Sequence, residues 1–136
     1  MSRTPSIVFV SALVSLASCG GDSGPDNYQM AVDQANARQA EAITLAPASP
    51  CQAVQQCANL ALIAPEGRCP APSYRPYSLA SATASAASTA AADERSLAIH
   101  AISIAPPPIV ACTAMVVQPP SLACVSNTCQ AAPPAN

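Results

Sequence analysis

Residues 51–69 read CQAVQQCANLALIAPEGRC, and this stretch decides the fold of the chain. It places three cysteines around an apolar run whose best core candidates are Leu60, Leu62 and Ile63. Pro65-Glu66-Gly67 then predicts a turn. With three later cysteines, the stretch predicts a small domain held together by covalent cross-links. The six cysteines of this domain are Cys51, Cys57, Cys69, Cys112, Cys124 and Cys129.

The composition agrees with a thin core. The chain has 136 residues, no Trp and a single Phe, so that Tyr28, Tyr74 and Tyr77 are the only other aromatic residues. Alanine inflates the hydrophobic content of 51%, although its side chain buries little area. A domain of this size buries a modest share of its unfolded surface, and disulfides, metals or oligomerisation commonly compensate.

Charge argues against a nucleic-acid partner. The formal net charge is -2, charged residues make up 9% of the chain, and Lys is absent. Phosphate neutralisation needs several clustered cations, whereas the arginines of this sequence are scattered. We therefore expect no binding to nucleic acid.

Three roles compete for the six cysteines. A zinc site favours close pairs of thiolates, to which Cys124 and Cys129 come nearest. A redox enzyme would carry a Cys-x-x-Cys motif, which the sequence lacks. Structural disulfides fit an exported protein best. We expect at least one bridge between the early and the late cysteines, because nothing else strong would hold the C-terminal part to the rest.

Residues 1–18 have the features of an export signal. Arg3 supplies the positive charge, Ile7 to Leu16 the apolar stretch, and Ala17-Ser18 the small residues before a cleavage point. The apolar run is too short to span a bilayer as a stable helix.

Leu16-Ala17-Ser18-Cys19 resembles the lipobox of bacterial lipoproteins. The resemblance implies cleavage before Cys19 by signal peptidase II and attachment of acyl chains, such as palmitate, to that cysteine. In this family, Gly20 in place of Asp implies sorting to the outer membrane of a Gram-negative cell. The alternative is an ordinary secreted protein, cut near Ser18 or Gly20, in which Cys19 is an odd thiol.

The acylated Cys19 would make the lipid bilayer a partner, and residues 19–27 would form a flexible tether. From Asp26 to about Leu45, apolar residues recur at helical spacing, and Pro47 and Pro50 end the pattern. Two roles stay open for residues 28–49, namely a solvated spacer helix with its linker or a helix docked on the domain.

Prolines dominate residues 69–78, CPAPSYRPYS. They force extended backbone, and Pro76 restricts the stretch to an edge strand or a loop. Tyr74, Arg75 and Tyr77 are a possible contact surface, because exposed Tyr and Arg anchor interfaces. The alternative, which we favour, is that both rings cover the small core.

The following stretch, from about Ser78 to Ile102, predicts an alanine-rich helix. We expect Asp93, Glu94 and Arg95 on its solvated side. Ile109 to Val117 is rich in Val and Ile, which favours a strand.

A short hairpin is predicted near the C-terminus, with Leu122 to Cys124 and Cys129 to Ala131 as strands around Ser126-Asn127-Thr128. The expected fold is thus a disulfide-stapled α+β domain over residues 50–131, with an alanine-rich helix and a few short antiparallel strands. Residues 132–136 would be a loose tail.

Several of these features occur together in a known group of proteins. Gln56-Cys57, Cys69 with Pro72, Tyr74 with Tyr77-Ser78, a helix and a late cysteine pair follow in that order. The pattern resembles small, uncharacterised, cysteine-rich bacterial envelope proteins, except that Pro70-Ala71 stands where that group has glycines. The resemblance implies a shared scaffold and no particular reaction.

Catalytic constellations are not recognisable. His100 is the only histidine, Asp93 lies nearly two helical turns from it, and no Gly-x-Ser-x-Gly elbow or glycine-rich phosphate loop is present. Glu66 and the charges at 93–95 are expected to be exposed. We predict no enzyme, no cofactor and no metal.

The leading functional prediction is a membrane-anchored envelope lipoprotein that acts as a non-enzymatic interaction or structural module. Its partner would be an envelope protein or a glycan. The alternative is a disulfide-framed inhibitor or capture protein for a soluble target such as a protease, which would use the loop from Pro70 to Tyr77.

Overall fold

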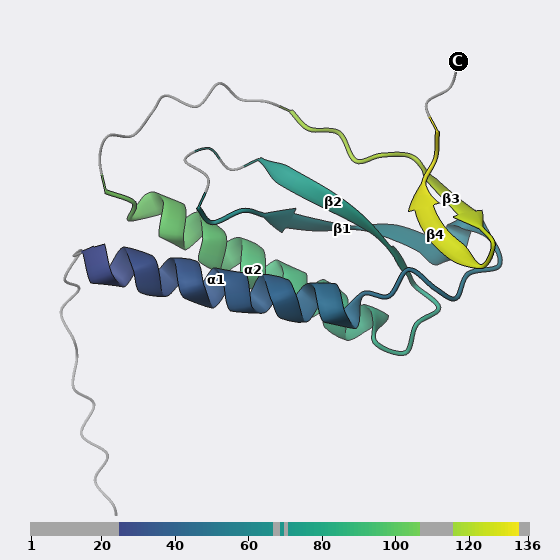
Figure 1. The fold of residues 1–136 in the computed structure, drawn as a ribbon, viewed down its shortest axis with the longest axis horizontal. Coiled ribbons are helices and arrows are strands. Elements are labelled where there is room, and N and C mark those ends of the chain that lie inside the picture. Colours follow the sequence, from purple (N-terminus) through teal and green to yellow (C-terminus); the bar gives the residue numbers. More distant parts are fainter. Residues whose placement is uncertain (1–24, 67–68, 70, 107–115, 134–136) are drawn as a thin grey trace, which may run out of the picture.

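The computed structural model describes residues 25–66, 69, 71–106 and 116–133. Within these residues the chain has two helices and four antiparallel strands in two small sheets, which confirms the predicted α+β class (Figure 1). In the same ranges, no helix combines the length and the apolarity that a membrane crossing requires.

The two helices are α1 (Pro25–Leu45) and α2 (Ala84–Ser103), and they pack side by side along an alanine seam. Ala35 packs with Ala98, and Ala42 packs with Ala87, so the helices run antiparallel. Buried positions recur every three or four residues, which places them on one face of α2. These positions are Ala87, Ala90, Ala91, Glu94, Ala98 and Ala101.

Helix α1 is docked on the domain and is no solvated spacer. Its residues Ala35 and Ala42 are 0% exposed, and Val32 is buried against Ala101 of α2. The helix begins at Pro25, whose ring favours the first helical position, and it ends two residues before Pro47. The folded unit therefore includes the predicted spacer segment.

The larger sheet consists of β1 (Cys57–Ile63) and β2 (Pro72–Ser78), with Cys57 opposite Ser78 and Ile63 opposite Pro72. This ribbon lies along one side of the helix pair (Figure 1). Leu60, Leu62 and Ile63 are all buried, as predicted, and Tyr77 joins the leucines against the alanine seam.

Helix α2 begins at Ala84, six residues later than the expected start at Ser78. Ser78 is the last residue of β2, and hydroxyl groups stabilise the turns that follow it. The Ala80 N–H donates to Ser78 Oγ at 3.1 Å, and the Thr83 N–H donates to Ser81 Oγ at 3.2 Å. Such local bonds compete with helix formation.

A short 3-10 helix, η1 (Val54–Gln56), precedes β1, and the second sheet is the hairpin of β3 (Leu122–Val125) and β4 (Thr128–Ala131). Ser126 and Asn127 between its strands have φ of 50° and 63°. Two positive φ values are typical of a type I′ turn, for which Asn is favoured. The predicted hairpin is confirmed.

The expected strand from Ile109 to Val117 lies mostly outside the described residues. Its described part, Val116 and Val117, has no regular secondary structure. Residues 134–136 of the expected tail also lie outside the described part of the chain.

Candidate functional site

The predicted contact surface on β2 is only partly exposed. Arg75 is exposed and Tyr74 is half-buried, but Tyr77 is only 6% exposed. Tyr77 belongs to the core because its ring packs among the leucines and alanines of the main cluster. The Tyr74 hydroxyl donates to the Val117 carbonyl oxygen at 3.3 Å. The favoured alternative, in which the rings cover the core, therefore holds for Tyr77 and not for the half-buried Tyr74, and only Tyr74 and Arg75 of the possible contact surface remain accessible.

The stretch predicted as an inhibitory loop is mostly a strand. Residues 72–78 pair with β1 along their whole length, so they do not protrude as a loop that a protease could engage. The Ser78 N–H donates to the Pro47 carbonyl oxygen at 2.9 Å, away from β1. Backbone N–H groups point to alternate sides along a strand, so the backbone nitrogens of Pro76 and Pro72 also point away from β1. Because proline has no N–H, this edge lacks a donor at both positions. This is the predicted edge strand.

Side chains from α2 close the opposite edge of the sheet. The Ile63 N–H donates to both carboxylate oxygens of Glu94, at 3.2 and 3.3 Å. Arg95 Nη1 donates to the Ala61 carbonyl oxygen at 3.4 Å. With prolines on one edge and α2 side chains on the other, neither edge favours addition of a partner strand.

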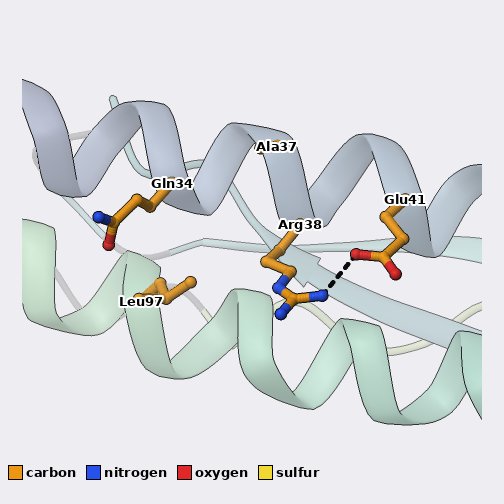
Figure 2. A pocket seen from close by; sticks show the side chains of 5 residues that line it. All are labelled: Gln34, Ala37, Arg38, Glu41 and Leu97. Atoms are coloured by element: carbon orange, nitrogen blue, oxygen red, sulfur yellow. Dashed lines mark hydrogen bonds and ion pairs between the residues drawn. The ribbon is translucent and has the colours of Figure 1, made fainter. Parts of the chain in front are cut away.

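A surface groove of about 400 Å³ lies between α1 and α2 (Figure 2). Arg38 Nη1 donates to Glu41 Oε2 at 2.6 Å, and this bond raises the pKa of the guanidinium. Each side chain of this ion pair is 46% exposed. The groove offers polar contacts and no nucleophile among the residues that line it, which are Gln34, Ala37, Arg38, Glu41 and Leu97. The groove was not predictable from the sequence, because no motif marks a groove between helices.

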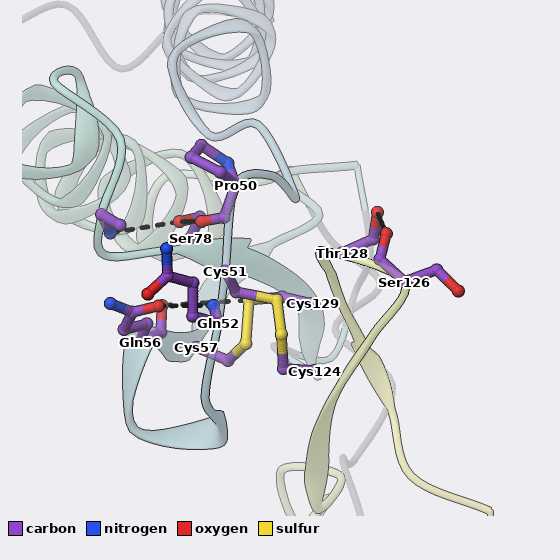
Figure 3. Close-up of a disulfide and its surroundings, with 11 residues drawn as sticks. Pro50, Cys51, Gln52, Gln56, Cys57, Ser78, Cys124, Ser126, Thr128 and Cys129 are labelled. Carbon is purple, nitrogen blue, oxygen red and sulfur yellow. Dashed lines mark hydrogen bonds between the residues drawn. A yellow bond between two sulfur atoms is a disulfide. The ribbon is translucent and has the colours of Figure 1, made fainter.

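The cysteines link the two ends of the domain, as expected. Cys51 is bonded to Cys124 with the Cα atoms 6.0 Å apart, and Cys57 is bonded to Cys129 with the Cα atoms 5.5 Å apart (Figure 3). Both bridges join the start of β1 to the C-terminal hairpin, so the predicted link between the early and the late cysteines is confirmed.

Cys69 also forms a disulfide. The other four described cysteines pair with one another, and Cys19 and Cys112 lie outside the described residues. The predicted lipidation of Cys19 likewise falls outside the described part of the chain.

Three of these sulfur atoms are close enough together to suggest a metal site. The Sγ atoms of Cys51, Cys57 and Cys129 lie within 4.8 Å of one another. A cysteine binds metal as a thiolate, whereas each of these sulfurs is bonded to another sulfur. The donor set in its observed state therefore does not fit a metal ion.

Glu94 is the residue that the sequence analysis placed wrongly. Its side chain is 0% exposed, although a charged residue between Asp93 and Arg95 was expected on the solvated side of α2. Glu94 occupies the buried face because its carboxylate accepts the backbone N–H of Ile63. The spacing of the alanines on either side, at Ala91 and Ala98, was the signal that could have identified it.

Burial raises the pKa of Glu94 above its ordinary value of 4.5, while the hydrogen bond from Ile63 and the charge of Arg95 oppose the rise. The folded state then binds a proton more tightly than the unfolded state does. The contribution of Glu94 to stability is therefore fully present below the unfolded pKa and is lost as the pH rises through the raised folded pKa.

We expect Glu94→Gln to remove this part of the pH dependence, because the amide oxygen can still accept the Ile63 N–H without a buried charge. Glu94→Ala should lower the free energy of unfolding by about 1–3 kcal/mol, since it leaves that N–H unpaired. Urea unfolding at pH 5 and pH 8 measures both effects. Asp93→Asn is the exposed control and should keep the pH profile of the parent protein; a Glu94→Gln profile that matches the parent would contradict this role.

The remaining candidates are dispersed over the surface. His100 and Asp93 are exposed, as is Glu66, which accepts a hydrogen bond from Asn36 Nδ2 at 2.9 Å. The structure brings none of these three together into a catalytic arrangement among the residues it describes.

Comparisons with known protein families, with curated proteins and with solved structures found no match to this chain.

Proposed function

We propose that the chain is a lipid-anchored protein of the bacterial outer membrane that acts as a non-enzymatic interaction or structural module. The observation that carries this proposal is the sequence Leu16-Ala17-Ser18-Cys19, followed by a short tether that enters α1 at Pro25. Disulfides between distant segments support it further, because such bridges persist in oxidising compartments outside the cytoplasm.

The position of the tether gives the module an orientation. Helix α1 has 21 residues and is therefore about 30 Å long. An anchor at its N-terminal end would hold that end near the bilayer and present the disulfide end to the surroundings. Val54 and Leu79 lie at the disulfide end, 43% and 48% exposed, and the Leu79 N–H donates to the Gln56 carbonyl oxygen at 2.7 Å. Exposed apolar side chains there favour contact with an envelope protein or a glycan.

The anchor is tested by the intact mass of the membrane-extracted protein. We expect acyl groups on Cys19, and we expect Cys19→Ala to abolish both the acylation and the cleavage before residue 19, so that this variant keeps the mass of residues 1–18. Ser18→Ala is the matched control, because it keeps a small residue before the cleavage point. An unacylated protein, or a Cys19→Ala variant that is still cut before residue 19, would contradict the proposal.

The interaction role is tested separately by photo-cross-linking in whole cells, with the photoreactive residue at Leu79. A specific adduct is expected from Leu79 and not from Asn27, which is exposed at the membrane-proximal end of α1. No adduct at either position, with the acylated protein present, would count against an interaction module.

A further inference from the structure

The two bridges that link the sheet to the hairpin lie side by side (Figure 3). Because the Sγ atoms of Cys51, Cys57 and Cys129 lie within 4.8 Å of one another, a sulfur released from one bridge is next to the other bridge. The four cysteines differ in access to solvent. Cys51, Cys57 and Cys129 are 2%, 9% and 3% exposed, whereas Cys124 is half-buried. An external nucleophile therefore reaches Cys124 most readily.

A second pairing of the same four cysteines is compatible with the backbone. Cys124 and Cys129 are directly opposite in the register of the hairpin. Opposite residues of an antiparallel pair have Cα atoms about 4.5–5.5 Å apart, which is within the range of disulfides. Cys51 and Cys57 flank η1, and their sulfurs are already among the neighbouring atoms. Bridges within each segment can thus form without a long movement of the chain.

We infer that these four cysteines form a thiol–disulfide exchange centre, which an external thiolate opens at Cys124. The exchange converts the pairs Cys51–Cys124 and Cys57–Cys129 into Cys51–Cys57 and Cys124–Cys129. No disulfide then links the hairpin to Cys51 or Cys57 next to the β1–β2 sheet.

The chemistry is three successive displacements at sulfur. The external thiolate bonds to the Cys124 sulfur, and the Cys51–Cys124 bond breaks to leave a Cys51 thiolate. The Cys51 thiolate bonds to the Cys57 sulfur, and the Cys57–Cys129 bond breaks to leave a Cys129 thiolate. Finally, the Cys129 thiolate bonds to the Cys124 sulfur and expels the external thiolate. The external thiolate is regenerated, so the exchange needs no oxidant or reductant.

After the exchange, non-covalent contacts alone would hold the hairpin region against β1 and β2. The Cys51 N–H donates to the Asn127 carbonyl oxygen at 3.2 Å, and the Cys129 N–H donates to the Ala48 carbonyl oxygen at 2.8 Å. Asn59 Nδ2 donates to the Pro120 carbonyl oxygen at 2.9 Å. Exchange would therefore change a rigidly stapled end of the domain into one that can open.

The arginine positions allow a direct test on the full mature chain. Trypsin cleaves after Arg38, Arg68 and Arg95, and the chain lacks Lys. Fragment 39–68 carries Cys51 and Cys57, and fragment 96–136 carries Cys112, Cys124 and Cys129, so the two bridges of the structure join these fragments. The protein is exposed briefly to glutathione, its free thiols are blocked with an alkylating agent, and it is digested without reduction.

We expect fragment 39–68 to be released without alkyl groups. Fragment 96–136 should carry glutathione on Cys124 and an alkyl group on Cys129 before the third displacement, and neither group once Cys124 and Cys129 have bonded to each other. The amount of released fragment 39–68 without alkyl groups should exceed the amount of the same fragment with two alkyl groups at least tenfold. Fragments that stay linked, glutathione on Cys51, or an alkyl group on Cys57 would overturn the assigned route.

Cys57→Ala/Cys129→Ala is the control variant, because it keeps only the bridge that the thiol attacks first. Glutathione should still add to Cys124 in this variant, but fragment 39–68 should now carry an alkyl group on Cys51. A control whose Cys51 remains unalkylated after its bridge to Cys124 has opened would overturn the second step, in which Cys51 attacks Cys57.

Discussion

Replacing Cys51 and Cys124 by alanine, or Cys57 and Cys129 by alanine, should lower the free energy of unfolding by about 3 kcal/mol, and replacing all four by about 6–7 kcal/mol. The bridges span 73 and 72 residues of sequence, but they join the same two segments. While one bridge remains, the other closes only the small ring formed by residues 51–57 and 124–129, which has about a dozen residues. Only the loss of both bridges releases the hairpin from the segment that carries Cys51 and Cys57.

Urea unfolding of the two paired variants and of the fourfold variant measures these differences, and paired replacement leaves no thiol to mispair. The full loss is about half or more of the 5–15 kcal/mol that stabilises ordinary domains. We therefore expect the fourfold variant to be unfolded near room temperature. A fourfold variant with the parent unfolding midpoint would show that the helix–sheet core is sufficient without these bridges.

Local signals in the sequence predicted the parts of the fold that depend on backbone chemistry. Ser126 and Asn127 tolerate positive φ, which identified the hairpin. Pro76 lacks an N–H, which limited its stretch to an edge strand or a loop, and the structure has the strand. The apolar run of Leu60, Leu62 and Ile63 identified the core strand.

Alanine explains most of what the sequence did not predict. Its side chain is compatible with a solvated face and with a buried one, so residues such as Ala35 and Ala98 do not reveal which side of a helix is covered. For this reason the docking of α1 stayed open, and the burial of Glu94 was missed. The partner of each cysteine also could not be predicted, because pairing depends on which segments the folded backbone brings together.

The same abundance of alanine makes the few large side chains unusually important. Leu60 is 3% exposed and lies in the main core cluster with Leu62 and Tyr77. Its other buried neighbours in this cluster are alanines, namely Ala42, Ala46, Ala87, Ala90 and Ala91. Alanine has no side-chain rotamers that could move into a cavity, so most neighbours of Leu60 in this cluster cannot refill a space left by a smaller residue.

We therefore expect Leu60→Ala to lower the free energy of unfolding by about 3–5 kcal/mol, toward the upper end of the range for such substitutions. Leu79→Ala is the matched control, because Leu79 is 48% exposed and the same change there should matter by less than about 0.5 kcal/mol. Urea unfolding of the oxidised variants measures both. A loss at Leu60 no larger than the loss at Leu79 would contradict the conclusion that burial of Leu60 against the alanine seam holds β1 on the helices.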